Sequence, residues 1–256
     1  MRITLLGTGT SQGVPVIGCD CKVCQSRDAQ DKRLRTSAML EWDNHRLVID
    51  CGPDFRTQML REQVKHIDAI LYTHEHADHT AGLDDIRPLY FRQKKPVPIY
   101  ALQRVLNNLQ QRFDYIFTRE NRYPGAPEVA PQSLQAGQKF SLNGLNISAL
   151  DVLHGDLPIL GYIFDSKIAY ITDAKKLPEK SKKKLQGIEL LIINALHHKP
   201  HKMHLNLKES LALIAEIKPR KAVLTHISHH MGTYKEIAPK LPAHVIMGFD
   251  GLKMEI

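Results

Sequence analysis

The stretch Tyr72-Thr73-His74-Glu75-His76-Ala77-Asp78-His79 organises the rest of the chain. It follows an apolar run at residues 67–71, which is typical of a buried strand. A solvated polar loop is the alternative, but four ligand-type residues at this spacing argue against it. Alternate residues of an extended chain point the same way, so His74 and His76 can share one metal ion. The Asp78-His79 pair follows a turn and can reach a second ion.

Length and composition restrict the class of protein. A chain of 256 residues can bury a substantial core, and we predict a single domain over residues 1–256. The contents of 43% hydrophobic and 24% charged residues are ordinary for a soluble globular protein. No segment approaches the roughly 18 consecutive apolar residues of a membrane span, and residues 1–6 are too short an apolar stretch for a signal peptide. The sequence therefore predicts a cytoplasmic protein without a membrane segment.

The net charge of +8 favours anionic partners. Nucleic acid, phosphate esters and acidic metabolites all meet this condition, and charge alone does not choose among them.

A glycine-rich segment, Leu6-Gly7-Thr8-Gly9-Thr10-Ser11-Gln12-Gly13, follows the first apolar stretch. Its glycines do not have the spacing of a dinucleotide-binding fingerprint. The segment favours a turn from a strand into a loop. Approach of its backbone N–H groups to a phosphate is the alternative.

Three of the four cysteines fall in the stretch Gly18-Cys19-Asp20-Cys21-Lys22-Val23-Cys24. In a cytosolic protein, such a cluster favours metal binding over a disulfide. Buried thiols are the alternative, but a polar loop is a poor place for them. Three thiolates leave a tetrahedral zinc ion one ligand short, and the C-terminal histidines are the obvious source of the fourth. We predict a small zinc-binding loop at residues 18–24.

Ligand-type residues recur at the ends of predicted strands. A lone histidine is more often structural, but the repeated placement argues for one shared site along one edge of the sheets. The strands and the helices between them suit an α+β fold, a four-layer αββα sandwich. The residues placed in this way are Asp50, His74, His154, Asp173 and His226.

Turn signals at Asp43-Asn44, Asn143-Gly144 and Asp165-Ser166 predict three hairpins. Asn206, with Glu209 three residues later, predicts the capped start of a helix. Residues 113–131 are rich in aromatic residues and proline and lack periodicity, which predicts a long loop. Three interpretations of this loop remain open. It is a lid on the substrate side, a dimer contact, or a packed surface loop.

The His-x-His-x-Asp-His order resembles that of the metallo-β-lactamase fold superfamily. The chain is similar nearly end to end to the PhnP-type phosphodiesterases, cyclic-phosphate hydrolases close to the tRNase Z branch. The segments that carry the resemblance are the opening Leu-Gly-Thr-Gly, the cysteine cluster, the His74 loop, Thr172-Asp173 with Leu177-Pro178-Glu179, residues 224–229 and the closing Gly248-Phe249-Asp250-Gly251.

This resemblance implies two metal centres. A dinuclear catalytic centre would hold manganese or zinc, with His74, His76 and His154 on one ion, Asp78, His79 and His226 on the other, and Asp173 bridging them. A structural zinc ion would be held by Cys19, Cys21, Cys24 and His229. Asp50 would orient the metal loop from outside. His204 stands at the position of the general acid, with His201 in reserve.

The implied activity is the hydrolysis of cyclic or small phosphodiesters, and the resemblance suggests 5-phosphoribosyl 1,2-cyclic phosphate as one such substrate. A hydroxide shared by the two ions would attack phosphorus, and a histidine near its ordinary pKa would protonate the leaving alkoxide. The resemblance also implies a homodimer and a small anionic phosphodiester substrate. The segment 113–131 looks longer than in the pathway enzymes, which puts the cyclic ribosyl substrate in question.

Three other activities are weaker interpretations of the sequence. RNA processing like that of tRNase Z would need a long, basic, glycine-rich arm to grip tRNA, and this sequence lacks one. Thioester hydrolysis of the glyoxalase II type leaves the cysteine cluster unexplained. A zinc-stabilised RNA-binding module without catalysis has no need of Asp173 or His204.

Overall fold

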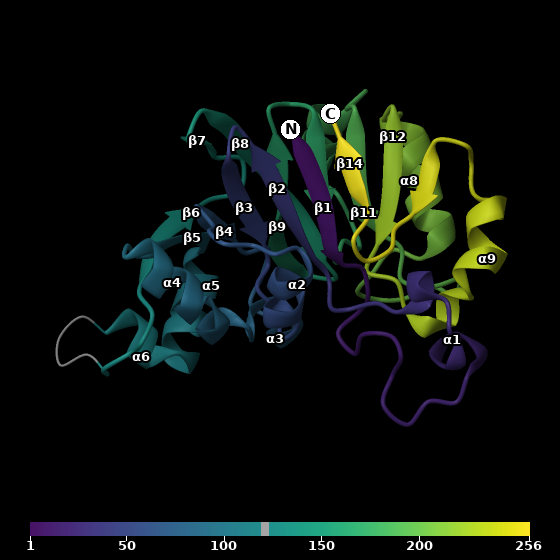
Figure 1. Cartoon of the computed structure of the whole chain (residues 1–256). Helices are drawn as coiled ribbons and strands as arrows, with labels where there is room; N and C mark the ends of the chain where they lie inside the picture. The colour runs from purple at the N-terminus through teal and green to yellow at the C-terminus, as the bar shows by residue number, and fades with distance from the viewer. Residues whose placement is uncertain (119–122) are drawn as a thin grey trace.

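The computed structural model describes residues 1–118 and 123–256 of the chain, and these residues form two seven-stranded sheets (Figure 1). In spatial order, the first sheet consists of β14 (Lys253–Glu255), β1 (Arg2–Gly7), β2 (Ser37–Trp42), β3 (His45–Ile49), β4 (Ala69–Leu71), β5 (Val97–Leu102) and β6 (Val129–Leu134). The second consists of β13 (Val245–Met247), β12 (Lys221–Thr225), β11 (Leu190–Asn194), β10 (Ile168–Ile171), β9 (Leu157–Phe164), β8 (Leu145–His154) and β7 (Lys139–Leu142).

Each sheet has an antiparallel half and a parallel half. Strands β14 to β3 pair antiparallel and β3 to β6 parallel, while β7 to β10 pair antiparallel and β10 to β13 parallel. Parallel neighbours need crossover connections, and these connections carry most of the helices. The carboxyl ends of the parallel strands therefore meet at the same edge of each sheet.

The helices of the described residues lie mostly outside the two sheets (Figure 1). The α-helices are α1 (Lys22–Gln25), α2 (Phe55–Arg61), α3 (Ala77–Thr80), α4 (Arg87–Gln93), α5 (Gln103–Arg112), α6 (Asp114–Phe117), α7 (Glu179–Leu185), α8 (Leu207–Ile217) and α9 (Tyr234–Ile237). Short 3₁₀ helices are η1 (Ala29–Asp31), η2 (Leu83–Ile86), η3 (His229–Met231) and η4 (Ala238–Lys240). Within residues 1–118 and 123–256, the helices are all too short or too polar to span a lipid bilayer.

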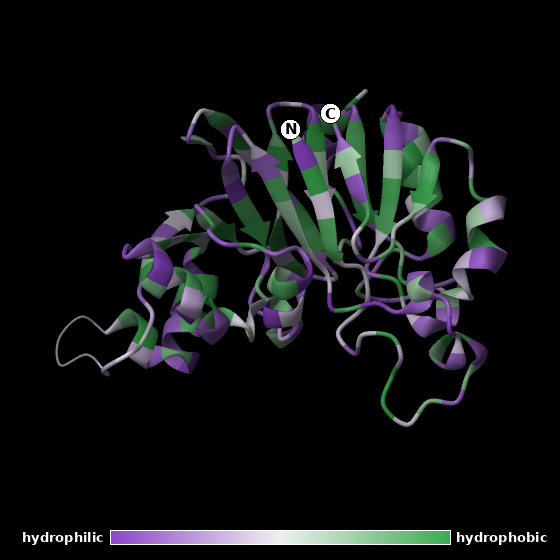
Figure 2. Ribbon diagram, viewed as in Figure 1, coloured by the Kyte–Doolittle hydropathy of each residue, from purple (hydrophilic) through white to green (hydrophobic). Residues whose placement is uncertain are grey.

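Three hydrophobic cores separate four layers, which confirms the predicted αββα sandwich. The central core joins the facing sides of the two sheets and includes Leu47 and Tyr170. A second core packs helices α2, α4 and α5 on the first sheet, around Phe55. A third packs α7 and α8 on the second sheet, around Ile214. Figure 2 shows the hydrophobic residues concentrated along the strands.

The predicted hairpins are present, since β2–β3, β7–β8 and β9–β10 are antiparallel neighbours. Their turn residues have the positive φ angles that such tight turns require, for example 47° at Asn143 and 85° at Gly144. The prediction of a loop over residues 113–131 is wrong at both ends, because the segment contains α6 and the start of β6. Residues 119–122 lie outside the described part. Strand β6 is the edge of its sheet, where Pro131 is tolerated although it lacks an N–H group.

Candidate metal centre

Three of the five strand-end residues, His154, Asp173 and His226, line one cavity of about 230 Å³ at the carboxyl edge of the sheets. The residues that line it are Ser11, His76, Asp78, His154, Asp173, Met203, His204 and His226. Three residues at the ends of their strands have left-handed backbones, with φ of 62° at Asp50, 56° at Asp173 and 53° at His226. This conformation is uncommon for residues other than glycine, and it is often retained at functional sites.

Two groups of ligand-type side chains lie on either side of Asp173. The potential ligand atoms of His74, His76 and His154 lie within 4.8 Å of one another, and so do those of Asp78, His79 and His226. Asp173 contacts the second group directly and also forms a close group with His74 and His79, and another with His154 and His204. Its Oδ2 lies 3.3 Å from His79 Nε2, and its Oδ1 lies 3.1 Å from His226 Nε2. The structure therefore brings together all seven residues predicted for the dinuclear centre.

Three of the clustered histidines have Nδ1 held by an oxygen outside the two groups. This arrangement leaves Nε2 of each ring directed inward, as in the outer shell of many metal sites. The distances are 2.9 Å from Thr73 Oγ1 to His74 Nδ1, 2.7 Å from Asp50 Oδ2 to His79 Nδ1, and 2.8 Å from the Met203 carbonyl oxygen to His154 Nδ1.

The charges in the cluster favour a cation. Burial opposes a charge on His79, but the carboxylates of Asp173, Asp50 and Asp78 outweigh it and raise the pKa of His79 well above its ordinary value. Burial, followed by the charge of His79, lowers the pKa of His74 well below its ordinary value. Three carboxylates thus favour one positive charge on His79 in a buried site, while the ring of His74 favours its neutral form. Divalent cations would supply this charge directly.

Buried nitrogen atoms without partners point to the same chemistry. Among the described residues, Nδ1 of His226 is buried without a hydrogen-bond partner, and Nε2 of His79 and of His226 contact Asp173 oxygens without hydrogen-bond geometry. A buried polar atom left unpaired is costly. The imidazole and carboxylate donors of the cluster are ligands that zinc and manganese accept. The residues present therefore fit a site for divalent metal ions.

Close backbone contacts fix the metal loop. Gly52 faces the Asp78 carbonyl so closely that a Cβ atom there would lie 2.1 Å from the oxygen. On the outer side, Arg104 in α5 forms a two-pronged ion pair with Glu75, at 2.9 and 3.2 Å. Arg112 donates to Thr80 Oγ1 at 2.7 Å. The sequence analysis missed both arginines because nothing in their local pattern distinguishes them from ordinary helix-surface residues.

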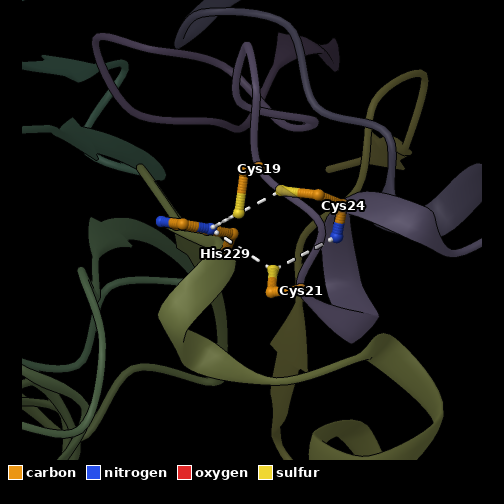
Figure 3. Close-up of side chains that lie close together, drawn as sticks. All are labelled: Cys19, Cys21, Cys24 and His229. Atoms are coloured by element: carbon orange, nitrogen blue, oxygen red, sulfur yellow. Dashed lines mark hydrogen bonds between the residues drawn. The ribbon is translucent and has the colours of Figure 1, made fainter.

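The cysteine cluster forms a separate centre (Figure 3). The Sγ atoms of Cys19, Cys21 and Cys24 lie 3.3, 3.4 and 3.5 Å from Nδ1 of His229, which comes from the other end of the chain. All four cysteines are free thiols. Three sulfur atoms and one imidazole nitrogen make a complete tetrahedral donor set for zinc. Cys51, by contrast, is completely buried in an apolar core.

His204 and His201, the two candidates for the general acid, lie in different places relative to the cavity. His204 lines the cavity, and its Nδ1 lies 3.6 Å from Asp173 Oδ1. The ring of His201 lies 5.1 Å from that of His204 and outside the cavity lining. Met203 and Ser11, which the sequence analysis did not single out, complete the lining.

A larger hollow, of about 660 Å³, lies around the amino-terminal end of β1, away from the cluster. Three of its charged side chains already pair with one another, since Glu41 contacts Arg2 at 2.7 Å and Arg46 at 3.0 Å. We therefore place the functional site at the smaller cavity.

The comparisons with known proteins agree with this geometry. A family model described as "Beta-lactamase superfamily domain" matches residues 45–227. A solved structure described as a new diphosphatase from the PhnP family is 41% identical with a TM-score of 0.92, covering 100% of this chain and 97% of that one. Zinc-bound PqqB from Methylobacterium extorquens is 20% identical with a TM-score of 0.82, covering 100% of both chains, and shares the fold.

One relative has a different kind of name. An octanoyltransferase of Porphyromonas gingivalis is 40% identical over 255 residues, which are 99% of this chain and 51% of that protein. The chain thus spans about half the length of that relative.

The fold and the two ligand groups define a metal-dependent hydrolase. The chain belongs to the metallo-β-lactamase superfamily and is of the PhnP type within it.

Proposed function

We propose that this protein hydrolyses cyclic or small phosphodiesters at a dinuclear metal centre. The observation that carries the proposal is the position of Asp173, with a carboxylate between two groups of metal ligands and a third neighbour, His204, in the same cavity. Two-metal sites of this kind suit the displacement of an oxygen leaving group from phosphorus. The cavity of about 230 Å³ suits a phosphoryl group with small substituents.

The seven predicted ligands would hold two divalent ions. One ion would be bound by His74, His76 and His154, and the other by Asp78, His79 and His226. Asp173 would bind both ions. Divalent ions held there would lower the pKa of a water molecule and would neutralise charge on the phosphoryl oxygens. Manganese and zinc both suit the donor set. We assign a separate structural zinc to Cys19, Cys21, Cys24 and His229.

His204 would give a proton to the leaving oxygen. Burial, together with the ring of His226, lowers the pKa of His204 to about 3 in the free protein. In the metal-free protein the pKa of His204 is therefore below the ordinary value that we expected. An anionic phosphodiester beside the ring would favour its protonated form.

Two further reactions follow from the relatives. The name of the 41% identical structure suggests cleavage of a phosphoanhydride, which uses the same attack on phosphorus. The octanoyltransferase name belongs to a protein about twice as long, half of which has no counterpart in this chain. Octanoyl transfer is accordingly the weaker candidate, because the matching half need not carry it.

A substrate panel tests the proposal. The metal-loaded protein, prepared separately with manganese and with zinc, is assayed on bis(p-nitrophenyl) phosphate, a cyclic ribosyl phosphate, a nucleoside diphosphate derivative, p-nitrophenyl phosphate and an octanoyl thioester. We expect turnover of the diesters, with much weaker action on the monoester and the thioester. Exclusive cleavage of the diphosphate, or exclusive hydrolysis of the thioester, would replace the proposed substrate class. Tight RNA binding without turnover would favour the binding module.

A further inference from the structure

Ser11 has a position in the cavity that the metal chemistry does not explain. Of the eight residues that line the cavity, five are predicted metal ligands and one is the predicted acid, which leaves Ser11 and Met203. Ser11 is exposed in a turn, and no hydrogen bond of its hydroxyl group is found among the described residues. A free hydroxyl group at the wall of a metal cavity is available to a substrate.

The loop that carries Ser11, residues 8–13, is held firmly at its base. Thr8 accepts a hydrogen bond from the buried Arg33 at 2.8 Å and donates one to Asp250 at 2.7 Å. Thr36 Oγ1 donates to the carbonyl of Gly9 at 2.6 Å, and a Cβ atom at Gly9 would lie 2.9 Å from the Arg33 carbonyl. The closing Gly-Phe-Asp-Gly motif thus serves to anchor this loop.

The loop lies on the side of the second ligand group. The N–H group of Ile227, next to His226, donates to the Thr8 carbonyl at 2.8 Å. The carbonyl of Ser11 accepts from Arg35 Nε at 3.3 Å. Met203 lies on the other side, where its carbonyl holds His154. The cavity therefore has a polar wall at Ser11 and an apolar wall at Met203.

We propose that Ser11 binds the substrate, and that its hydroxyl group donates a hydrogen bond to a non-bridging oxygen of the phosphoryl group. The inference rests on the proposed function. A phosphodiester carries its negative charge on two non-bridging oxygens, and hydroxyl groups donate well to such acceptors. The rigid base of the loop presents the hydroxyl group without further ordering of the chain. Met203 would then face a substituent of the diester.

Three variants of the metal-loaded protein test this role: Ser11→Ala removes the hydroxyl group, Ser11→Thr keeps it, and Gln12→Ala changes the exposed neighbour in the same turn. Calorimetry measures the Kd of inorganic phosphate, and assays give kcat and KM for bis(p-nitrophenyl) phosphate. For Ser11→Ala we expect both phosphate affinity and kcat/KM to fall roughly 10- to 100-fold, as for a lost hydrogen bond to a charged group. Ser11→Thr should stay close to the wild type and Gln12→Ala should equal it. All variants should keep the metal content of the wild type.

Phosphate binding that is unchanged in Ser11→Ala would overturn the inference. Equal losses in Ser11→Ala and Ser11→Thr, or a loss of metal in Ser11→Ala, would overturn it as well, because the loop shape and not the hydroxyl group would then matter. Phosphate affinity that depends on the hydroxyl group, in a wild type that cleaves no diester, would support the inference and refute the proposed function.

Discussion

The Oδ2 atom of Asp50 lies 2.7 Å from Nδ1 of His79, and both side chains are almost completely buried. The same carboxylate accepts hydrogen bonds from the backbone N–H and the hydroxyl of Thr73, at 2.8 and 2.9 Å. It thereby fixes the ring of His79 so that Nε2 faces Asp78 and Asp173, at 3.2 and 3.3 Å. Asp50, at the end of β3, thus orients the predicted ligand His79 in the loop that follows β4.

Asp50→Asn should weaken metal binding. Asparagine tolerates the left-handed backbone of this position, where φ is 62°, so the change removes charge and leaves the chain path intact. We expect roughly a 10- to 100-fold loss of metal affinity, as for other outer partners of ligating histidines. Titration against a competing chelator measures it. Asp165→Asn is the matched control, since Asp165 also has a positive φ but lies in a hairpin turn. Equal metal retention in the two variants would refute the orienting role.

His204→Ala should slow only substrates with poor leaving groups. An alkoxide needs a proton as it departs, whereas a p-nitrophenolate leaves unaided. We expect a loss of roughly 10²- to 10⁴-fold on a cyclic ribosyl phosphate, the range of general acid catalysis, and little change on bis(p-nitrophenyl) phosphate. His201→Ala is the control, because its ring lies outside the cavity lining. Equal loss on both substrates would instead indicate a positioning role for His204.

Gly155→Ala should disturb the first ligand group. Gly155 has a φ of 60°, and a Cβ atom there would lie 2.6 Å from Met203 Sδ. The clash is with the end of the Met203 side chain, and a shift of this residue would move the carbonyl that orients His154. Gly187→Ala is the matched control, with a φ of 68° and open space around the Cβ position. Each variant should lose about 1–2 kcal/mol of unfolding free energy from the left-handed backbone. We expect only Gly155→Ala to lose metal affinity as well, and equal metal affinity in both would contradict the account.

The cysteines of the metal-free protein should differ in reactivity. The N–H group of Cys24 donates to the sulfur of Cys21 and, with His229 and despite some burial, lowers the pKa of Cys21 to about 6. Burial raises the pKa of Cys24 to about 11. Because the thiolate is the reactive form, alkylation of Cys21 by iodoacetamide should rise with pH through about 6 and then level off. Cys24 should stay unreactive at neutral pH, and the buried Cys51 serves as an internal control.

Zinc should protect this cluster and remain bound when a mild chelator has removed the catalytic ions. Mass spectrometry identifies the alkylated residues, and metal analysis counts the retained zinc. Alkylation of Cys21 at the same rate with and without zinc would refute the assignment of a structural zinc to this loop.

Local sequence patterns account for much of this architecture. Apolar runs bounded by turn residues predicted the strands, because burial of alternate or continuous apolar faces requires those patterns. The sequence also determined the strand-end positions of Asp50, His154, Asp173 and His226. These strands all end at the same edge of the sandwich, although β8 pairs antiparallel with its neighbours, and this common edge brings the residues near one another. The spacing of the cysteines indicated a missing fourth ligand without placing it.

Packing of the folded chain sets which side chains surround the cavity and how their pKa values are shifted. The contacts of Met203 with His154 and of Arg104 with Glu75 join residues far apart in the chain, and no local pattern encodes them. Residues 113–131 contain an edge strand because pairing with β5 outweighs the local signals of proline and glycine. The low pKa of His204 arises from burial and from the neighbouring His226. Burial and long-range contacts depend on how the layers pack, and packing is a property of the folded chain.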